Sequence, residues 1–136
     1  MIKLGHFLSL DEVLNLVIFD AKAEIPLKTS KKIETSYKTL TQLADSEIAY
    51  YGINTGFGAL AEKKISVKDR ASLQKNIILS HAVGVGEPLD FFTAKTLTLL
   101  RLNTLVQGFS GASPKLIEHL LRLFSENCAP LVPKKG

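Results

Sequence analysis

The segment DFFTAKTLTLLRLNTLVQ, residues 90–107, constrains the fold more than any other stretch of this chain. Its pattern predicts a helix that Asp90 caps and that stops at Gly108. At about 100° per residue, the large apolar side chains cover nearly the whole circumference of that helix. They are Phe91, Phe92, Leu97, Leu99, Leu100, Leu102, Leu105 and Val106. A helix that is apolar all round is buried on several sides, and a chain of 136 residues supplies few neighbours to cover it.

The first part of the chain predicts a short strand and two helices. Residues 2–4 read IKL and favour a strand, and Ser9 and Glu12 then form an S-x-x-E capping box. The helix that this box begins should end near Phe19. A second helix should end near Asp45, because apolar residues recur on one helical face, namely Ile33, Tyr37, Leu40 and Ala44.

Two more helices are predicted further along. Ser66 begins one that should end near Val83, and Ser113, followed by proline, begins an amphipathic one that should end near Asn127. Proline and glycine indicate two connections without regular structure, at residues 24–30 and 84–90. The predicted class is mainly α, and residues 1–136 carry no convincing domain boundary.

Charge and composition exclude several classes of protein. The net charge is +4, and the lysines are scattered rather than gathered into a basic stripe with aromatics, so nucleic-acid binding is not expected. No stretch of about 18 apolar residues exists, which argues against a membrane span. The N-terminus lacks the pattern of a signal peptide. The single cysteine, Cys128, forms no intrachain disulfide and fits a reducing compartment, so a cytoplasmic location is expected.

Few residues outside one loop are candidates for chemistry. Cys128 has no histidine near it in sequence and is interpreted as a buried or half-buried thiol. His119 should be solvated at the edge of a polar helix face, and His6 has no visible partner. These spacings predict no metal site. His81 shares a helical stripe with Gln74 and Ile78, which is more typical of a core or interface histidine than of a catalyst.

The loop YYGINTGFG, residues 50–58, places Tyr51 beside three glycines. Gly52, Gly56 and Gly58 permit positive φ and close approach of another group. The spacing matches neither a P-loop nor a dinucleotide fingerprint. From the pattern alone, Tyr51 is a packing aromatic in a tight turn or a functional phenol exposed on a loop.

Four blocks in this order closely resemble the aromatic amino acid ammonia-lyase family, and in particular the N-terminal region of its histidine ammonia-lyases. They are YYGINTGFGAL, LQKNIILSHAVGVGEPL, RLNTLVQGFSGASPKLIEHLL and APLVPKKG. The resemblance covers essentially the whole chain but only about the first quarter of a family enzyme. It implies non-hydrolytic elimination of ammonia from an amino acid, which for histidine gives urocanate, in a homotetramer with a long helical bundle.

The resemblance also assigns roles to individual residues. Tyr51 matches the family's loop tyrosine, the candidate base for the β-proton, and a phenol needs help to ionise because its ordinary pKa is about 10. His81 falls where histidine- and tyrosine-specific members carry histidine, so it is the candidate substrate contact. Gly52, Asn54 and Gly56 match motif letters that shape the loop.

The family's electrophile, a methylidene-imidazolone ring formed from Ala-Ser-Gly, is not expected in these residues. Ala112-Ser113 is followed by Pro114, which has no backbone N–H for ring closure. In the family the tripeptide comes a few residues after P-x-K-G, with which this chain ends. The 136 residues are therefore expected to be inactive alone. The alternatives are a segment of a tyrosine ammonia-lyase or aromatic aminomutase, or a non-catalytic helical module that assembles with itself or with a lyase.

Overall fold

The computed structural model describes residues 1–58 and 61–136. Within them are five helices: α1 (Leu10–Val17), α2 (Leu27–Asp45), α3 (Val67–His81), α4 (Phe91–Val106) and α5 (Pro114–Ser125). Strands β1 (Ile2–Lys3) and β2 (Ala23–Glu24) pair in parallel, and β3 (Val85–Pro88) pairs antiparallel with β4 (Pro133–Lys135). The mainly α class predicted from the sequence is confirmed.

The predicted helix starts are confirmed at each side-chain cap. Ser9 and Glu12 form the complete capping box of α1. The side chains of Ser66, Asp90 and Ser113 each accept a hydrogen bond from the backbone N–H three residues ahead. These short polar side chains satisfy N–H groups that the first helical turn leaves free. The helix ends were less accurate, since α1, α3 and α5 each stop two residues before the predicted end.

Both predicted connections were partly wrong. In residues 24–30, α2 begins at Leu27, directly after Pro26, whose φ of −61° already suits a helix start. Ala23 and Glu24 form β2 because they pair with the N-terminal strand. In residues 84–90, β3 forms by pairing with the C-terminal segment of the chain. Both strands depend on partners far away in the sequence, which local patterns do not report.

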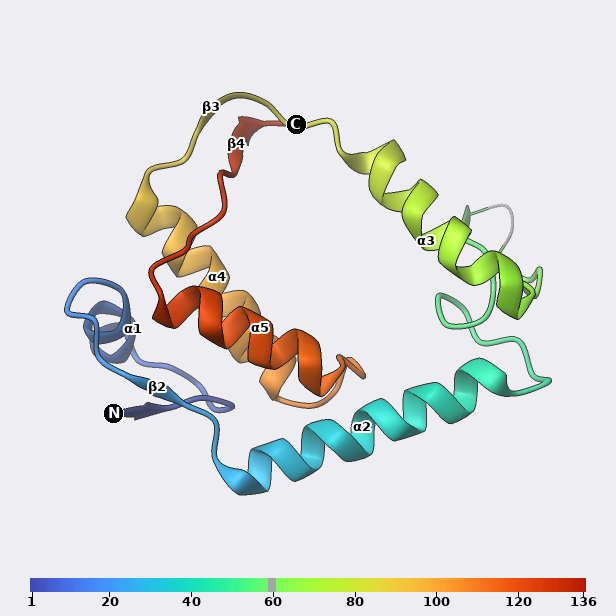
Figure 1. The fold of residues 1–136 in the computed structure, drawn as a ribbon, viewed down its shortest axis with the longest axis horizontal. Helices are drawn as coiled ribbons and strands as arrows, with labels where there is room; N and C mark the ends of the chain where they lie inside the picture. The colour runs from blue at the N-terminus through green and yellow to red at the C-terminus, as the bar shows by residue number, and fades with distance from the viewer. Residues whose placement is uncertain (59–60) are drawn as a thin grey trace.

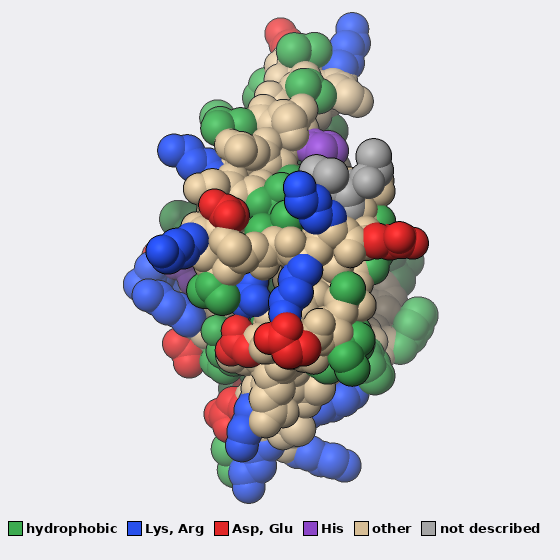
Figure 2. Space-filling model, turned by 90° about the vertical axis from the view of Figure 1, so that its right-hand side faces the viewer, with side chains coloured by type: hydrophobic (Ala, Val, Ile, Leu, Met, Phe, Trp, Pro, Cys, Tyr) green, Lys and Arg blue, Asp and Glu red, His purple; other side chains and the backbone are tan. Residues whose placement is uncertain are grey.

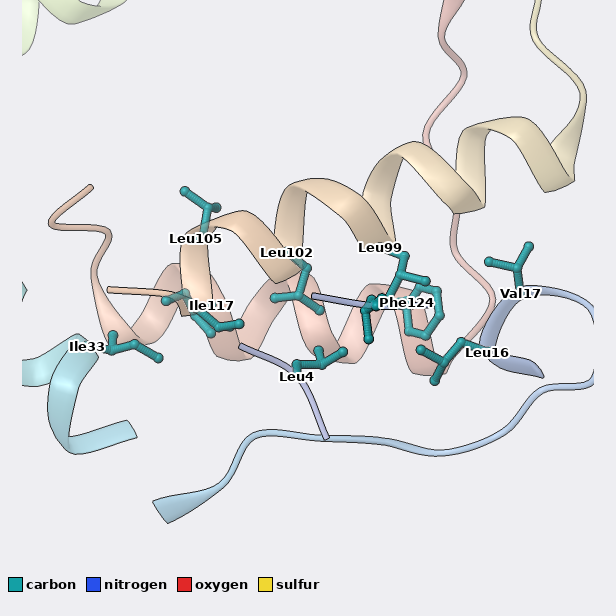
Figure 3. Packing of buried hydrophobic residues seen from close by; sticks show 11 residues of the cluster. Leu4, Leu16, Val17, Ile33, Leu99, Leu102, Leu105, Ile117 and Phe124 are labelled. Carbon is teal, nitrogen blue, oxygen red and sulfur yellow. The ribbon is translucent and has the colours of Figure 1, made fainter. Parts of the chain in front are cut away.

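The core lies where α4 and α5 pack side by side against α1 and the start of α2 (Figure 1). Figure 3 shows Leu99 and Leu102 of α4 on the side that faces Ile117 and Phe124 of α5. The buried cluster consists of Leu4, Leu8, Leu16, Val17, Ile33, Leu99, Leu102, Leu105, Val106, Ile117 and Phe124. α4 therefore is the central helix that its sequence predicts.

The expected shortage of neighbours around α4 is also confirmed. Phe91, Phe92, Leu97 and Leu100 are each 43–50% exposed although they belong to this apolar helix. α3 stands apart from the α4–α5 pair (Figure 1), and none of its residues is buried. The loop after α2 leads into the start of α3, and β3, which pairs with β4, follows the end of α3.

Candidate functional site

The loop that carries Tyr51 is fastened to the end of α2 by the side chain of Asn54. Asn54 is 1% exposed. Its amide nitrogen lies within hydrogen-bond distance of three carbonyl oxygens, those of Leu43 at 3.3 Å, Ser46 at 3.2 Å and Ile48 at 2.9 Å. Its Oδ1 accepts from the Tyr50 N–H at 2.7 Å. One buried amide thus occupies carbonyls at the C-terminus of α2 and fixes the chain just before Tyr51.

Thr55 holds the chain on the other side of Tyr51. The Gly52 N–H donates to Thr55 Oγ1 at 3.3 Å, and this hydroxyl lies 3.0 Å from the Gly56 carbonyl oxygen. It also lies 3.5 Å from the Tyr50 carbonyl oxygen. Thr55 is 3% exposed. The sequence interpretation assigned Thr55 no role, and the only available signal was its place inside the NTG letters of the loop.

Tyr51 itself extends into solvent, with 67% of its surface exposed. Its ring meets Phe57 edge-on, with centroids 6.0 Å apart and planes at 71°, a favourable aromatic geometry. Gly52, the next residue, adopts a φ of 72°, which a side chain would disfavour. Tyr51 is therefore an exposed phenol on a hydrogen-bonded turn rather than a core aromatic.

His81 is the last residue of α3 and is also exposed. Its Nδ1 lies 2.9 Å from the Ile77 carbonyl oxygen and 3.1 Å from Ser80 Oγ. A carbonyl only accepts, so this contact assigns the proton of a neutral ring to Nδ1. The other nitrogen, Nε2, is then the one available to a ligand. The exposure of His81 argues against a core histidine.

The two candidate residues, Tyr51 and His81, contact different parts of the chain. The recorded contacts of the His81 ring belong to its own helix, whereas Tyr51 contacts Phe57 in its loop. α3 separates the two in sequence, and its fifteen residues span about 22 Å. Among the loop-shaping candidates, Gly56 is buried and its N–H donates to the Lys63 carbonyl at 3.1 Å.

A groove of about 700 Å³ lies beside this loop. It is lined by α2, by Gly52 and Ile53 of the loop, and by the connection between α4 and α5, residues 108–111. Two contacts hold that connection to α2: the Gly111 N–H donates to Ser36 Oγ at 3.2 Å, and Lys32 Nζ lies 3.8 Å from the centre of the Phe109 ring. The turn that carries Tyr51 therefore borders an open groove.

Two other sequence interpretations were wrong. Cys128 is exposed and follows Asn127, where the backbone turns with a φ of 56°. His6 does have a partner, since its Nε2 lies 3.3 Å from Glu12 Oε1. His119 is exposed as predicted, and its Nδ1 lies 3.3 Å from an Arg122 nitrogen.

The residues described do not fit the ring-forming tripeptide of the resembled family. Ala112 and Ser113 lead into α5, and the Ser113 hydroxyl already accepts a hydrogen bond from the Leu116 N–H as the helix cap. Pro114 occupies the first helical position and supplies no N–H. The sequence Ala-Ser-Gly does not occur in the chain.

Other kinds of site receive no support from the described residues. Within them no cluster of three or more histidine, cysteine or carboxylate side chains has the geometry to hold a metal ion. Their helices include none that is both long enough and apolar enough to span a membrane. On the face shown in Figure 2, basic side chains lie scattered among acidic and hydrophobic ones.

The fold and the tyrosine loop define a class of protein when they are compared with known families. The family model for aromatic amino acid lyases matches residues 8–136. The chain therefore belongs to the aromatic amino acid lyase family.

Within that family, similar curated proteins are histidine ammonia-lyases, which are carbon–nitrogen lyases. The one from Stigmatella aurantiaca is 38% identical over 132 residues, which are 97% of this chain and 26% of the relative. The one from Bacillus subtilis is 38% identical over 121 residues, covering 88% of this chain and 24% of the relative. The chain thus spans about a quarter of the length of these relatives.

Solved structures agree with the family assignment. The histidine ammonia-lyase from Trypanosoma cruzi superimposes with a TM-score of 0.84 at 30% identity, covering 98% of this chain and 26% of that one. Tyrosine aminomutase from Streptomyces globisporus gives a TM-score of 0.88 at 28% identity, covering 97% and 25%. The described arrangement of helices is accordingly that of an aromatic amino acid lyase segment.

Proposed function

We propose that this chain is the N-terminal segment of a cytoplasmic histidine ammonia-lyase, which eliminates ammonia from L-histidine to give urocanate. The observation that carries the proposal is the loop at residues 50–58, in which an exposed tyrosine is held on a turn by two buried polar side chains. The curated histidine ammonia-lyases that match nearly the whole chain support the choice of substrate.

In this proposal Tyr51 removes the β-proton of the substrate. The β-C–H bond is a weak acid, and a phenolate is a stronger base than a carboxylate or an imidazole. A phenol that is 67% exposed in this chain is free to be enclosed by other parts of an enzyme. A positive charge placed beside the phenol by those parts would stabilise the phenolate that this role requires.

His81 contacts the substrate side chain in the same proposal. Its Nδ1 is directed to the carbonyl of Ile77, so Nε2 is the nitrogen left to bond a ligand. A neutral imidazole in this tautomer offers an acceptor at Nε2 and can receive a hydrogen bond from a substrate imidazole or phenol. Asn54, Gly52 and Gly56 shape the loop and take no part in the chemistry.

The family's methylidene-imidazolone supplies the electrophile that makes the substrate amine a leaving group. Residues 1–136 do not contain its Ala-Ser-Gly precursor, and we expect them to be inactive alone. The remaining site residues, and a homotetramer that gathers them, belong to the proposed longer enzyme.

The experiment is an ammonia-release assay on the product of the complete reading frame, with L-histidine as the substrate. We expect urocanate and ammonia in equal amounts, and Tyr51→Phe should lower kcat at least about 100-fold. Near-normal activity of Tyr51→Phe would show that Tyr51 is not the base. A product that acts on tyrosine instead, or returns a β-amino acid, would favour the tyrosine ammonia-lyase or aromatic aminomutase alternative. The observation that supports this alternative is the similarity of the chain to tyrosine aminomutase structures, at 26–29% identity.

A second candidate is a non-catalytic helical module that assembles through apolar surface. It is favoured by the exposed apolar side chains of α3 and α4, including Ile78, Leu79 and Phe92 at 50–68% exposure. Light scattering distinguishes it, because a monomer that does not bind a lyase subunit would exclude an assembly role.

A further inference from the structure

The two peptide groups that flank Tyr51 are both in contact with one buried hydroxyl. The peptide group before Tyr51 contains the Tyr50 carbonyl, and the peptide group after it contains the Gly52 N–H. Thr55 Oγ1 accepts from that N–H at 3.3 Å and lies 3.5 Å from the carbonyl oxygen. The orientations of these two groups set φ and ψ of Tyr51, and hence the direction of its Cα–Cβ bond.

The hydroxyl of Thr55 is itself held firmly. The residue is 3% exposed, and its hydroxyl lies 3.0 Å from the Gly56 carbonyl oxygen. The adjoining backbone is fixed from outside the turn, because the Ile65 N–H donates to the Asn54 carbonyl at 2.9 Å and the Gly56 N–H donates to the Lys63 carbonyl at 3.1 Å. Pairing with residues 63–65 therefore fixes the backbone of Thr55, and the Thr55 hydroxyl in turn bonds the peptide group that follows Tyr51.

The peptide group before Tyr51 has other bonds, because the Tyr50 carbonyl accepts from the Ile53 N–H at 3.1 Å and from the Asn54 N–H at 3.2 Å. The side chain of Tyr51 and the peptide group after it have fewer constraints. Its phenol is exposed, and the recorded aromatic neighbour is Phe57, which is itself 39% exposed. Asn54 fixes the Tyr50 N–H, which lies one peptide group further from Tyr51 and leaves the Gly52 side free. The described contacts thus assign the Gly52 side of Tyr51 to Thr55.

We propose that Thr55 is a positioning residue, whose hydroxyl holds the peptide group that follows Tyr51 and so aims its phenol at the substrate. The role rests on the proposed function of Tyr51 as the base. A misplacement of about 1 Å in a reacting group can cost on the order of 100-fold in rate. Loss of the hydroxyl should therefore lower kcat and leave substrate affinity nearly unchanged.

The test compares Thr55→Val, which keeps the shape and removes the hydroxyl, with Thr55→Ser, which keeps the hydroxyl. Thr41→Val is the matched control, because it removes an exposed hydroxyl that bonds only within α2, to the Tyr37 carbonyl. In the product of the complete reading frame, we expect T55V to lower kcat about 10- to 100-fold. KM should stay within about twofold, and T55S and T41V should keep most of the wild-type kcat. Melting curves establish that each variant is folded.

A second readout needs no activity. In the 136-residue chain, amide hydrogen exchange at Gly52 should be at least about tenfold faster in T55V than in wild type, whereas exchange at Tyr50 should change little. If Gly52 exchange and kcat are both unchanged in T55V while Y51F is inactive, Thr55 does not position Tyr51. If T55V fails to fold but T55S lowers kcat as much as an inactive variant does, the role of the hydroxyl is also overturned. If Y51F retains activity, the proposed function fails, and the positioning role fails with it.

Discussion

The Lys95 ammonium donates a hydrogen bond of 2.6 Å to the Asp20 carboxylate and joins α4 to the turn after α1. The two partners differ sharply in burial, since the Lys95 side chain is 4% exposed and that of Asp20 is 64% exposed. Lys95 also donates to the Val17 carbonyl at 3.0 Å and lies 5.4 Å from the centre of the Phe124 ring. The positive charge is thus inside the protein and its counter-ion is at the surface.

This asymmetry predicts that loss of the acid is more harmful than loss of the base. In Asp20→Gly the buried ammonium loses its counter-ion, whereas in Lys95→Met the exposed carboxylate is simply hydrated and the long side chain still packs. Glycine is the suitable replacement because Asp20 has a φ of 52°. We expect D20G to lower Tm roughly twice as much as K95M does. Thermal melts check this, and an equal or larger effect of K95M would contradict it.

The same pair predicts a loss of stability in acid. The hydrogen bond from Lys95, and secondarily its charge, hold the pKa of Asp20 below its ordinary value of 3.8. A carboxyl whose pKa is lowered on folding stabilises the protein above its unfolded pKa, and this contribution is lost as pH falls through the folded pKa. Stability should therefore fall as pH decreases below about 4. Solvent weakens the effect, because Asp20 is mostly exposed.

Asp20→Asn is the control for this pH dependence. It removes the titrating group and keeps an oxygen that can accept from Lys95. In urea titrations between about pH 5 and pH 3, the wild-type chain should lose more stability than D20N. Parallel curves would show that Asp20 does not contribute. The pKa values of Glu12, Glu47 and Asp90 are also lowered. These carboxyls account for the dependence of stability on pH that remains in D20N.

The positions of the helices could largely be predicted from the sequence, because their starts are encoded locally. Ser9, Ser66, Asp90 and Ser113 each sit three residues before the N–H that they cap, so a pattern of four residues is sufficient. The central place of α4 followed in the same way from its all-round apolar surface. β2 and β3 could not be predicted, since their stability comes from pairing with distant segments.

The buried polar contacts could not be predicted either. Lys95 and Asn103 lie in the apolar helix α4 and bond to groups 75 to 98 residues away in sequence. Asn103 accepts from the Gly5 N–H at 2.8 Å and donates to the His6 carbonyl at 2.9 Å, so it fastens the N-terminal turn to α4. Polar letters inside an apolar helix were the available signal. For the candidate site, the loop and its tyrosine were readable as a motif, whereas the role of Thr55 depends on three-dimensional contacts.

A third prediction concerns substrate choice in the proposed enzyme. Replacement of His81 by leucine removes the free Nε2 and leaves an apolar side chain at the end of α3. We expect H81L to lower kcat/KM for histidine by about 10- to 100-fold, because a buried substrate nitrogen would lose its partner. Activity on phenylalanine should fall less or rise. Steady-state assays with both amino acids measure the ratio, and an unchanged ratio would remove His81 from the substrate site.

A fourth prediction concerns the amide of Asn54. In Asn54→Ala three carbonyl oxygens and the Tyr50 N–H lose a buried partner, which should cost about 1–3 kcal/mol. Asn54→Asp should cost more, although it is nearly isosteric, because a carboxylate oxygen would face those carbonyl oxygens. Urea unfolding of both variants gives the order. A more stable N54D than N54A would mean that the amide nitrogen does not make these contacts.

The last prediction concerns the close approach of the α4–α5 connection to α2. Gly111 and Gly58 both have positive φ, 63° and 56°, so alanine at either position should cost roughly 1–2 kcal/mol through the backbone. The two positions differ in the room available for a side chain. A Cβ on Gly111 would lie 2.8 Å from Leu40 Cβ and Cδ2, whereas a Cβ on Gly58 meets no described atom within 4 Å. We therefore expect G111A to cost about 1–3 kcal/mol more than G58A.

Leu40→Ala tests whether the contact with Leu40 causes the larger loss of stability in G111A. If the clash with Leu40 explains the cost, the double variant G111A/L40A should be more stable than the sum of the two single changes predicts, by at least about 0.5 kcal/mol. The excess cost arises because a Cβ would push the connection away from α2 and so stretch the hydrogen bond that the Gly111 N–H donates to Ser36 Oγ. Additive effects of the two changes, measured by urea unfolding, would mean that the connection can move without straining α2 and that the groove beside Tyr51 is adaptable rather than fixed.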